Sequence, residues 1–264
     1  KPIPPKQGDT NAKPQASDTG RGEGGSPPSE NEFEVLLWDL DKLTEPLAVL
    51  DAMRIDNQRR RWPIFVTAFG PDGRTVAVAS NKDSTYTVAL HSAATGEVTG
   101  QIDTQSENLN SLALGSNNVL AVAAGNTIQF WDRETRTFLS SLSSNRGGPG
   151  IMRFNAQGTL LAAAVGNQIE LWDTISHKIM AVLPSADRDW ATDLNFTPDG
   201  LGLVVGRFTT STASWRISDS SARTQLAGVA GESRDQHIRL SSLAFSPQGG
   251  LAIGTSNGET WFYG

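Results

Sequence analysis

The sequence predicts an all-β fold of repeated four-stranded antiparallel units. One observation is a series of tryptophans, most of them followed by a polar turn, spaced 41, 43 and 46 residues apart at Trp131, Trp172, Trp215 and Trp261. Leu90-His91 takes the same place one repeat upstream, and Trp38 opens the series. A period of about 40–45 residues with a Trp-Asp dipeptide is typical of a β-propeller blade, a unit that cannot bury its apolar faces alone.

A second observation is a turn in phase with these tryptophans. An aromatic residue and a turn that ends in glycine occur about eighteen residues before each one, at Phe69–Gly73, Phe154–Gly158, Phe196–Gly200 and Phe245–Gly249. Proline presets φ at the first corner of such a turn, and glycine accepts the positive φ that follows. The copy around Leu112–Asn118 keeps the spacing but has neither the Phe nor the Pro. Two signals in phase support a true repeat.

The third observation is a short apolar run after each turn, which we expect to form the second strand of each unit: Thr75–Ser80, Val119–Ala124, Thr159–Ala164, Leu201–Gly206 and Leu251–Gly254. Runs of about six residues suit strands that are covered on both faces better than they suit helices. Gly125-Asn126 and Gly166-Asn167 predict tight hairpin turns into the tryptophan strands. The expected fourth strands are Glu97–Asp103, Thr137–Leu142, Lys178–Leu183 and Thr224–Ala227.

On these residues the chain resembles the WD40 repeat family across residues 32–264, although the Gly-His dipeptide usual in such repeats is missing. The resemblance implies a β-propeller of about five and a half blades: a partial blade at 32–51, full blades within 64–103, 109–142, 150–183 and 191–227, and a partial blade at 240–264. It also implies that the repeated tryptophans are structural and fill space between neighbouring sheets. These are Trp38, Trp131, Trp172, Trp215 and Trp261.

A propeller must close to remove exposed sheet edges, and a half blade at each end does not close it. We therefore expect the chain to be a piece of a longer protein whose ring has six or seven blades. The alternative is a five-bladed ring in which Leu47–Asp51 closes the final blade and Phe33–Leu40 is surplus. Residues 1–31 are rich in Pro, Gly and Ser, and they predict a disordered linker or an insertion between strands.

Composition excludes some classes of function. The 264 residues carry a net charge of −6, which argues against a general nucleic-acid binder because such a protein shows a basic face. The chain has no cysteine, so disulfides and thiolate metal sites are excluded. No run approaches the roughly eighteen apolar residues of a membrane span. We expect no cofactor and no metal, and the compartment and the oligomeric state stay open.

The candidate binding surface is one rim of the propeller, where the loop from the outer strand of each blade reaches the inner strand of the next. These loops are Ala52–Pro63, Thr104–Asn108, Ser143–Gly150, Ser185–Trp190 and Gly228–Arg239. Long loops on a rigid scaffold often carry recognition, and Arg and Trp are enriched at interface hot spots. We therefore expect this rim to bind an acidic or extended segment of a partner protein. The candidate residues are Arg59, Arg60, Arg61, Trp62, Arg146, Arg188, Asp189, Trp190, Arg234 and His237.

Motifs for chemistry are weak. Gly254–Gly258 matches the G-x-S-x-G pattern, but it lies between two expected strands, whereas a nucleophile elbow needs a strand-to-helix turn. His91, His177 and His237 fall in different blades, so no pair has metal-ligand spacing. We expect a non-catalytic scaffold module within a larger protein. The alternative is a propeller enzyme or small-ligand sensor that uses the central channel.

Overall fold

We describe the fold from a computed structural model. It describes residues 32–39, 41–42, 44–54, 66–82, 85–144, 147–183, 190–207, 212–217, 219–225, 240–246 and 248–263, so the expected linker at 1–31 lies outside it. Every regular element of this part of the chain is a β-strand. It contains no helix that could cross a membrane.

Among the described residues, four complete sheets each contain four antiparallel strands in chain order. The first blade is β3 (Val66–Phe69), β4 (Thr75–Lys82), β5 (Thr85–Ser92) and β6 (Val98–Ser106), and the second is β7 (Leu109–Leu114), β8 (Val119–Ala124), β9 (Thr127–Asp132) and β10 (Phe138–Ser143). The third blade is β11 (Pro149–Phe154), β12 (Leu160–Val165), β13 (Gln168–Asp173) and β14 (Lys178–Leu183). The fourth blade is β15 (Ala191–Phe196), β16 (Gly202–Arg207), β17 (Thr212–Arg216) and β18 (Asp219–Gln225).

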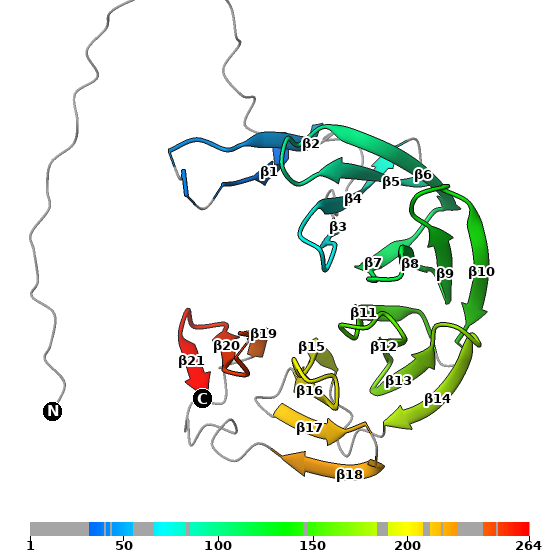
Figure 1. The fold of residues 1–264 in the computed structure, drawn as a ribbon, viewed down its shortest axis with the longest axis vertical. Helices are drawn as coiled ribbons and strands as arrows, with labels where there is room; N and C mark the ends of the chain where they lie inside the picture. Colours follow the sequence, from blue (N-terminus) through cyan, green and yellow to red (C-terminus); the bar gives the residue numbers. More distant parts are fainter. Residues whose placement is uncertain are drawn as a thin grey trace, which may run out of the picture.

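In the part of the chain that the structure describes, a two-stranded and a three-stranded sheet flank these blades. The N-terminal hairpin pairs β1 (Glu32–Leu37) with β2 (Ala48–Arg54), and the C-terminal sheet contains β19 (Leu240–Phe245), β20 (Leu251–Thr255) and β21 (Thr260–Tyr263). Figure 1 shows the six sheets side by side in an arc, with β3, β7, β11, β15 and β19 nearest the centre, and the arc is open between the hairpin and β21. The predicted fold class, a partial β-propeller, is confirmed.

The hydrophobic core consists of separate layers between successive sheets, because each strand alternates its side chains between two neighbouring blades. Between the second and third blades, Phe130 packs with Met152, Leu161 and Trp172, all nearly inaccessible to solvent. Comparable layers lie at the other sheet boundaries: Leu37 and Leu50 of the N-terminal hairpin pack on Val76 and Val78 of the first blade. Small residues such as Ala121 and Ala163 keep neighbouring sheets close.

The predicted turns between first and second strands are present. Gly73, Gly158 and Gly200 have φ of 66°, 71° and 71°, and Gly249 has φ of 96°. In the second blade, the copy without Phe and Pro, Asn118 takes the glycine place with φ of 64°. Asn tolerates the left-handed region better than most residues do, which explains how this degenerate copy keeps its turn.

The strand pairing shows that the residues predicted as equivalent repeats do not all occupy the same position in their sheets. Trp131, Trp172 and Trp215 pair with Leu120, Leu161 and Leu203 of the second strands. In the first blade and the C-terminal sheet, the same place opposite the second strand is taken by His91, which pairs with Val76, and by Tyr263, which pairs with Leu251. We call the place that Trp131, Trp172 and Trp215 share the repeat position. Leu90 therefore lies one residue before the repeat position of its sheet, and Trp261 lies two residues before it. Spacing in the sequence missed this because it cannot detect a change of register.

The N-terminal hairpin shows a similar difference. In the third blade a bulge between Leu171 and Trp172 marks the repeat position, and in β1 the bulge lies between Val35 and Leu36. Leu36 thus holds the place expected for Trp38, which lies just beyond the strand with 42% of its surface exposed. The fourth blade differs as well: its last strand begins at Asp219, because Arg216 pairs directly with Asp219, whereas the sequence predicted Thr224.

The aspartate that follows the tryptophan stabilises the corner of its blade. Asp132 Oδ1 accepts hydrogen bonds from the backbone N–H groups of Glu134 at 3.0 Å and Thr135 at 2.7 Å, and from the Thr135 hydroxyl. Asp173 Oδ1 accepts from the N–H groups of Ile175 at 3.1 Å and Ser176 at 2.6 Å. Donors to the charged form favour it, so the Thr135 and Ser176 hydrogen bonds hold the pKa of Asp132 and of Asp173 below the ordinary 3.8.

Candidate functional site

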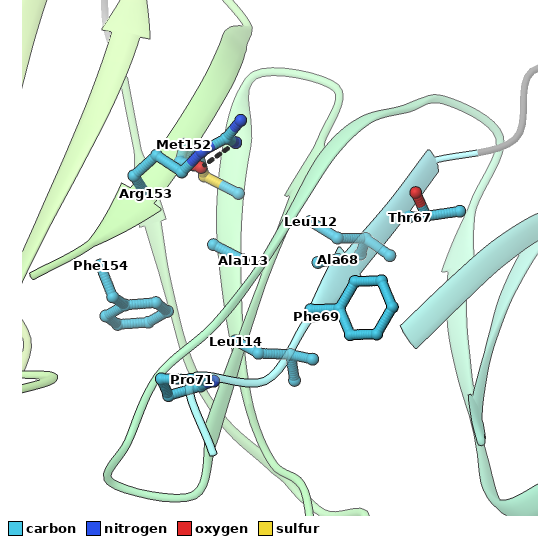
Figure 2. A pocket seen from close by; sticks show the side chains of 10 residues that line it. All are labelled: Thr67, Ala68, Phe69, Pro71, Leu112, Ala113, Leu114, Met152, Arg153 and Phe154. Atoms are coloured by element: carbon cyan, nitrogen blue, oxygen red, sulfur yellow. Dashed lines mark hydrogen bonds between the residues drawn. The ribbon is translucent and has the colours of Figure 1, made fainter. Parts of the chain in front are cut away.

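A cavity of about 340 Å³ lies among the inner strands of the first three blades. It is lined by residues of β3, β7 and β11 and of the turn after β3: Thr67, Ala68, Phe69, Pro71, Leu112, Ala113, Leu114, Met152, Arg153 and Phe154. Figure 2 shows the rings of Phe69 and Phe154 on either side of Ala113 and Leu114. Most of the lining residues are apolar, and Thr67 and Arg153 add polar groups.

The walls of this cavity are positioned by the turn motif. Phe69 and Phe154 are the last residues of β3 and β11, each directly before its turn. Gly115 lies under the Phe154 ring, where an added Cβ would be 3.3 Å from Phe154 Cδ1. The Asn117 amide also donates to the Gly158 carbonyl at 3.0 Å, which joins the turns of the second and third blades. The cavity wall is therefore fixed by contacts between blades.

Arg153 is the cation among the described lining residues. Its guanidinium donates to the Met152 carbonyl at 3.0 Å and forms an ion pair with Asp193 Oδ1 on β15 at 3.2 Å. The Asp193 side chain is itself largely buried and also accepts from the backbone N–H groups of Leu194 at 2.9 Å and Leu243 at 2.8 Å. Arg153 is thus held in place, with its charge balanced by Asp193.

Asp193 belongs to a set of hydrogen bonds that connect successive inner strands. Ser111 Oγ on β7 accepts from the Met152 N–H on β11 at 3.2 Å, in the same way that Asp193 on β15 accepts from Leu243 on β19. The Asn195 amide adds a bond of 2.7 Å to the Leu243 carbonyl. Partners lie 41, 50 and 48 residues apart in these three bonds, so neighbouring blades are joined by polar contacts as well as apolar ones.

Most of the candidate rim residues lie outside the described residues, namely Arg59, Arg60, Arg61, Trp62, Arg146, Arg188, Asp189, Arg234 and His237. Trp190 is described: it directly precedes β15, and 70% of its surface is exposed. Phe69 and Phe154 lie at the opposite ends of their inner strands. Because the inner strands occupy equivalent places in their blades, Trp190 and the phenylalanines of the cavity lie toward opposite faces of the propeller.

The other motifs have structural roles. Ser256 to Gly258 form the turn between β20 and β21, so the G-x-S-x-G match connects two strands and is not a nucleophile elbow. His91 is buried, and its Nδ1 lies 2.9 Å from the Gly96 carbonyl oxygen. His177 stacks on Phe130 of the second blade, with ring centroids 5.3 Å apart. Within the described residues, no three His, Cys, Asp or Glu side chains gather as a metal site would require.

The sequence did not single out the cavity. Its aromatic walls belong to the turn motif, which predicted only a fold, and Arg153 carries no motif of its own. The one signal for it was the phenylalanine that recurs at the end of the inner strands in every blade but the second, where Leu114 stands instead. That recurrence marks the cavity only after the blades are placed side by side.

Comparisons with known proteins give the fold and no family. No protein-family model matches the chain, and no curated protein matches its sequence. Among solved structures, the chain is similar to Kuenenia stuttgartiensis hydrazine synthase, with a TM-score of 0.59 and 17% sequence identity over 72% of this chain. The match covers 55% of that chain's length. At this identity the likeness supports a propeller-like fold and says nothing of activity.

Proposed function

We propose that this chain is a non-catalytic protein-interaction module of the WD40-repeat type, part of a larger multidomain protein. The Trp-Asp dipeptides and the phased turns support the repeat type, and the arc of four-stranded sheets supports a rigid scaffold. Its partner is a protein segment that docks on the rim between the outer strand of one blade and the inner strand of the next.

The observation that carries this proposal is Trp190. This indole has 70% of its surface in solvent and belongs to none of the core clusters among the described residues, and it directly precedes β15 on the proposed rim. Tryptophan is among the residues enriched at binding hot spots, because it offers a large contact area with few rotatable bonds. A docked partner would cover the Trp190 indole.

Charge suggests the kind of partner. The whole chain carries a net charge of −6, yet Arg59, Arg60 and Arg61 follow one another in a single rim loop. Such a local basic cluster favours an acidic or extended partner segment. Its attraction should weaken as salt rises, because exposed charges are screened over about 8 Å at physiological ionic strength.

The test compares two exposed aromatic residues. Immobilised wild-type chain, Trp190→Ala and Phe262→Ala would each be exposed to extract from the native source, and captured proteins quantified by mass spectrometry at low and high salt. Phe262 is the control, because it is 79% exposed but lies on β21 at the end of the arc. We expect Trp190→Ala alone to lose salt-sensitive partners. Equal capture by all three proteins would remove the proposal.

A second candidate function, a small-ligand sensor, rests on the cavity. Its apolar walls of Phe69 and Phe154 suit a planar apolar ligand, while Arg153 offers a polar contact at one end (Figure 2). Methyl NMR of Met152, whose side chain lines the cavity, would detect binding of small aromatic carboxylates. Shifts that are lost in Phe154→Ala would support a sensor, and an unchanged Met152 signal would exclude these ligands.

A further inference from the structure

The cavity among the first three blades is an open slot with an aromatic ring at each side. Phe69 and Phe154 stand on either side of Ala113 and Leu114 (Figure 2). Phe69 keeps 60% of its surface in solvent, so a ligand can reach the slot from outside. The volume of about 340 Å³ is near the lower end of the range of about 300–1,000 Å³ for ligand pockets. The cavity therefore suits a group as small as one or two side chains.

The polar side chains of the lining mainly donate hydrogen bonds. A guanidinium has N–H donors and no acceptor, and within the described residues Arg153 donates to the Met152 carbonyl and to Asp193. The Arg153 side chain keeps 41% of its surface exposed, so its other N–H groups are accessible. Thr67 adds a hydroxyl, which donates or accepts. A fitting ligand is apolar, carries acceptors, and brings few N–H groups that would stay unpaired between the rings.

Proline-rich polypeptide has this chemistry. Proline combines an apolar ring and a backbone carbonyl with the absence of a backbone N–H. Proline-rich segments favour the polyproline II conformation, and aromatic-lined grooves bind them at a low cost in conformational entropy. Residues 1–31, which lie outside the described part of the chain, contain the run Pro2–Pro5, with three prolines and Ile3. This run offers carbonyl acceptors and a single backbone N–H.

Chain length selects this run over the other prolines of residues 1–31. The bulge of β1 marks it as a third strand, which runs parallel to a first strand, so Glu32 lies on the propeller face that holds Trp190. Pro28 spans at most about 14 Å from Glu32, less than the roughly 20 Å that a six-residue strand crosses to the opposite face. Pro5 has a reach of about 90 Å, which is ample for the cavity. Pro14 stands alone among polar residues.

We propose that the cavity binds a proline-rich polypeptide segment, and that the run Pro2–Pro5 of this chain is its occupant. One proline ring lies in the slot between Phe69 and Phe154, and a carbonyl of the run accepts a hydrogen bond from Arg153. A flexible linker holds the run near the cavity at an effective concentration on the order of millimolar, so a weak contact is enough. The proposal rests on the cavity of the second candidate function and is independent of the Trp190 rim.

The test uses the whole chain with one spin label. The chain has no cysteine, so Gln7→Cys creates a single attachment site for a nitroxide beside the run. The reporters are the methyl NMR signals of Met152, in the cavity wall, and Met180, on β14 with 60% of its surface exposed. A nitroxide broadens the signals of nearby methyl groups, so the two methionines report where the labelled segment lies.

A docked run should broaden the Met152 signal more than the Met180 signal. A segment that moves freely over the surface would do the reverse, because Met180 is exposed whereas Met152 is buried. Phe69→Ala removes one wall of the slot and should reduce the broadening of Met152. The exposed position of Phe69 makes it unlike a core truncation, and circular dichroism would check that the variant is folded.

Two pairs of proline substitutions give a matched comparison. The double variant Pro4→Ser/Pro5→Ser should abolish the selective broadening of Met152, because it removes the rings that fill the slot. The control Pro27→Ser/Pro28→Ser should leave the broadening unchanged, since these prolines are too close to β1 to reach the cavity. Equal effects of the two double variants would overturn the proposal.

Benzoate, a small aromatic carboxylate, separates this proposal from the small-ligand sensor. If the run fills the cavity nine-tenths of the time, Pro4→Ser/Pro5→Ser should bind benzoate about tenfold more tightly than wild type does. Equal benzoate binding without selective broadening of Met152 would overturn the docked run and leave the sensor intact. Selective broadening without any benzoate binding would support the docked run and count against the sensor.

Two further results would overturn the proposal. The first is broadening of Met180 that equals or exceeds that of Met152 in the otherwise unchanged chain. The second comes from a mixture in which the nitroxide and the isotope-labelled methionines are on different copies. Selective broadening of Met152 as strong in this mixture as within one copy would make the segment of a second copy the occupant.

Discussion

The Asp193 carboxylate on β15 accepts a hydrogen bond of 2.8 Å from the Leu243 backbone N–H on β19, in the neighbouring sheet. The side chain is largely buried, and its other oxygen pairs with Arg153 of the third blade. One residue thus joins three successive sheets. Asp193→Ala should lower the free energy of unfolding by about 2–3 kcal/mol, because it leaves a buried N–H and a guanidinium without their acceptor.

The control for this prediction is Ser242→Ala. Ser242 holds the position of Asp193 in the C-terminal sheet, since each follows the bulge of its inner strand, but it is exposed and no described sheet follows it. Its removal should change stability by less than about 0.5 kcal/mol. Urea unfolding of both variants makes the comparison, and equal costs would show that Asp193 does not join the sheets.

The tryptophans should differ in their contribution to stability according to register. Trp172 is 4% exposed and packs between the second and third blades, whereas Trp38 is 42% exposed. Trp172→Ala should cost about 3–5 kcal/mol, the range of aromatic truncations in cores. Trp38→Ala should cost less than about 1 kcal/mol. Thermal and urea unfolding would measure the stability of both variants. Equal costs for Trp38→Ala and Trp172→Ala would contradict the strand register that places Trp38 outside the core.

A close approach of two backbones favours glycine at position 148. A Cβ added at Gly148 would lie 2.4 Å from the Gly125 carbonyl oxygen, in the hairpin turn of the second blade. Main chain cannot move aside as a flexible side chain can, so Gly148→Ala should cost about 1–3 kcal/mol. Gly150→Ala is the matched control, because its nearest neighbour would be 3.7 Å away. If both variants unfold at the same urea concentration, this contact between blades is absent.

The corner aspartates predict a dependence of stability on pH. Their pKa values are lowered in the folded state, so each carboxylate stabilises the fold above its unfolded pKa of about 3.8, and this is lost as pH falls through the folded pKa. The double variant Asp132→Asn with Asp173→Asn should therefore be less stable than wild type at pH 7 and should approach it in acid.

Thr135→Ala gives the control for this pH dependence. It removes the hydroxyl that donates to Asp132 at 2.9 Å and should reduce, without abolishing, the difference between wild type and Asp132→Asn. Urea titrations between pH 2 and pH 7 would follow each variant. A stability difference that stays constant over this whole range would mean that these carboxylates have ordinary pKa values in the folded chain.

The sequence predicts the parts of this fold that depend on local residues. The turn glycines and the second strands lie where their short patterns place them, as with Gly158 and Val119–Ala124. The strand register was harder to predict, because Tyr263 and Leu36 occupy the places that the sequence spacing assigned to Trp261 and Trp38. A large apolar or aromatic residue can take the place of a tryptophan two residues away without any change in overall periodicity.

The polar contacts between blades could not be predicted from the sequence. Ser111 and Asp193 find backbone partners 41 and 50 residues away, and nothing in their neighbourhood distinguishes them from a surface serine and aspartate. The cavity likewise exists only once three inner strands lie together. Long-range geometry, rather than composition, creates these features.

The central claim is that successive blades pack directly against one another. The most direct measurement is a double-mutant cycle between Phe130 of the second blade and His177 at the corner of the third, whose rings stack with an interplanar angle of 14°. Phe130→Leu and His177→Ala should show a coupling energy of about 0.5–1.5 kcal/mol. Strictly additive effects, within about 0.3 kcal/mol, would contradict this packing of one blade on the next.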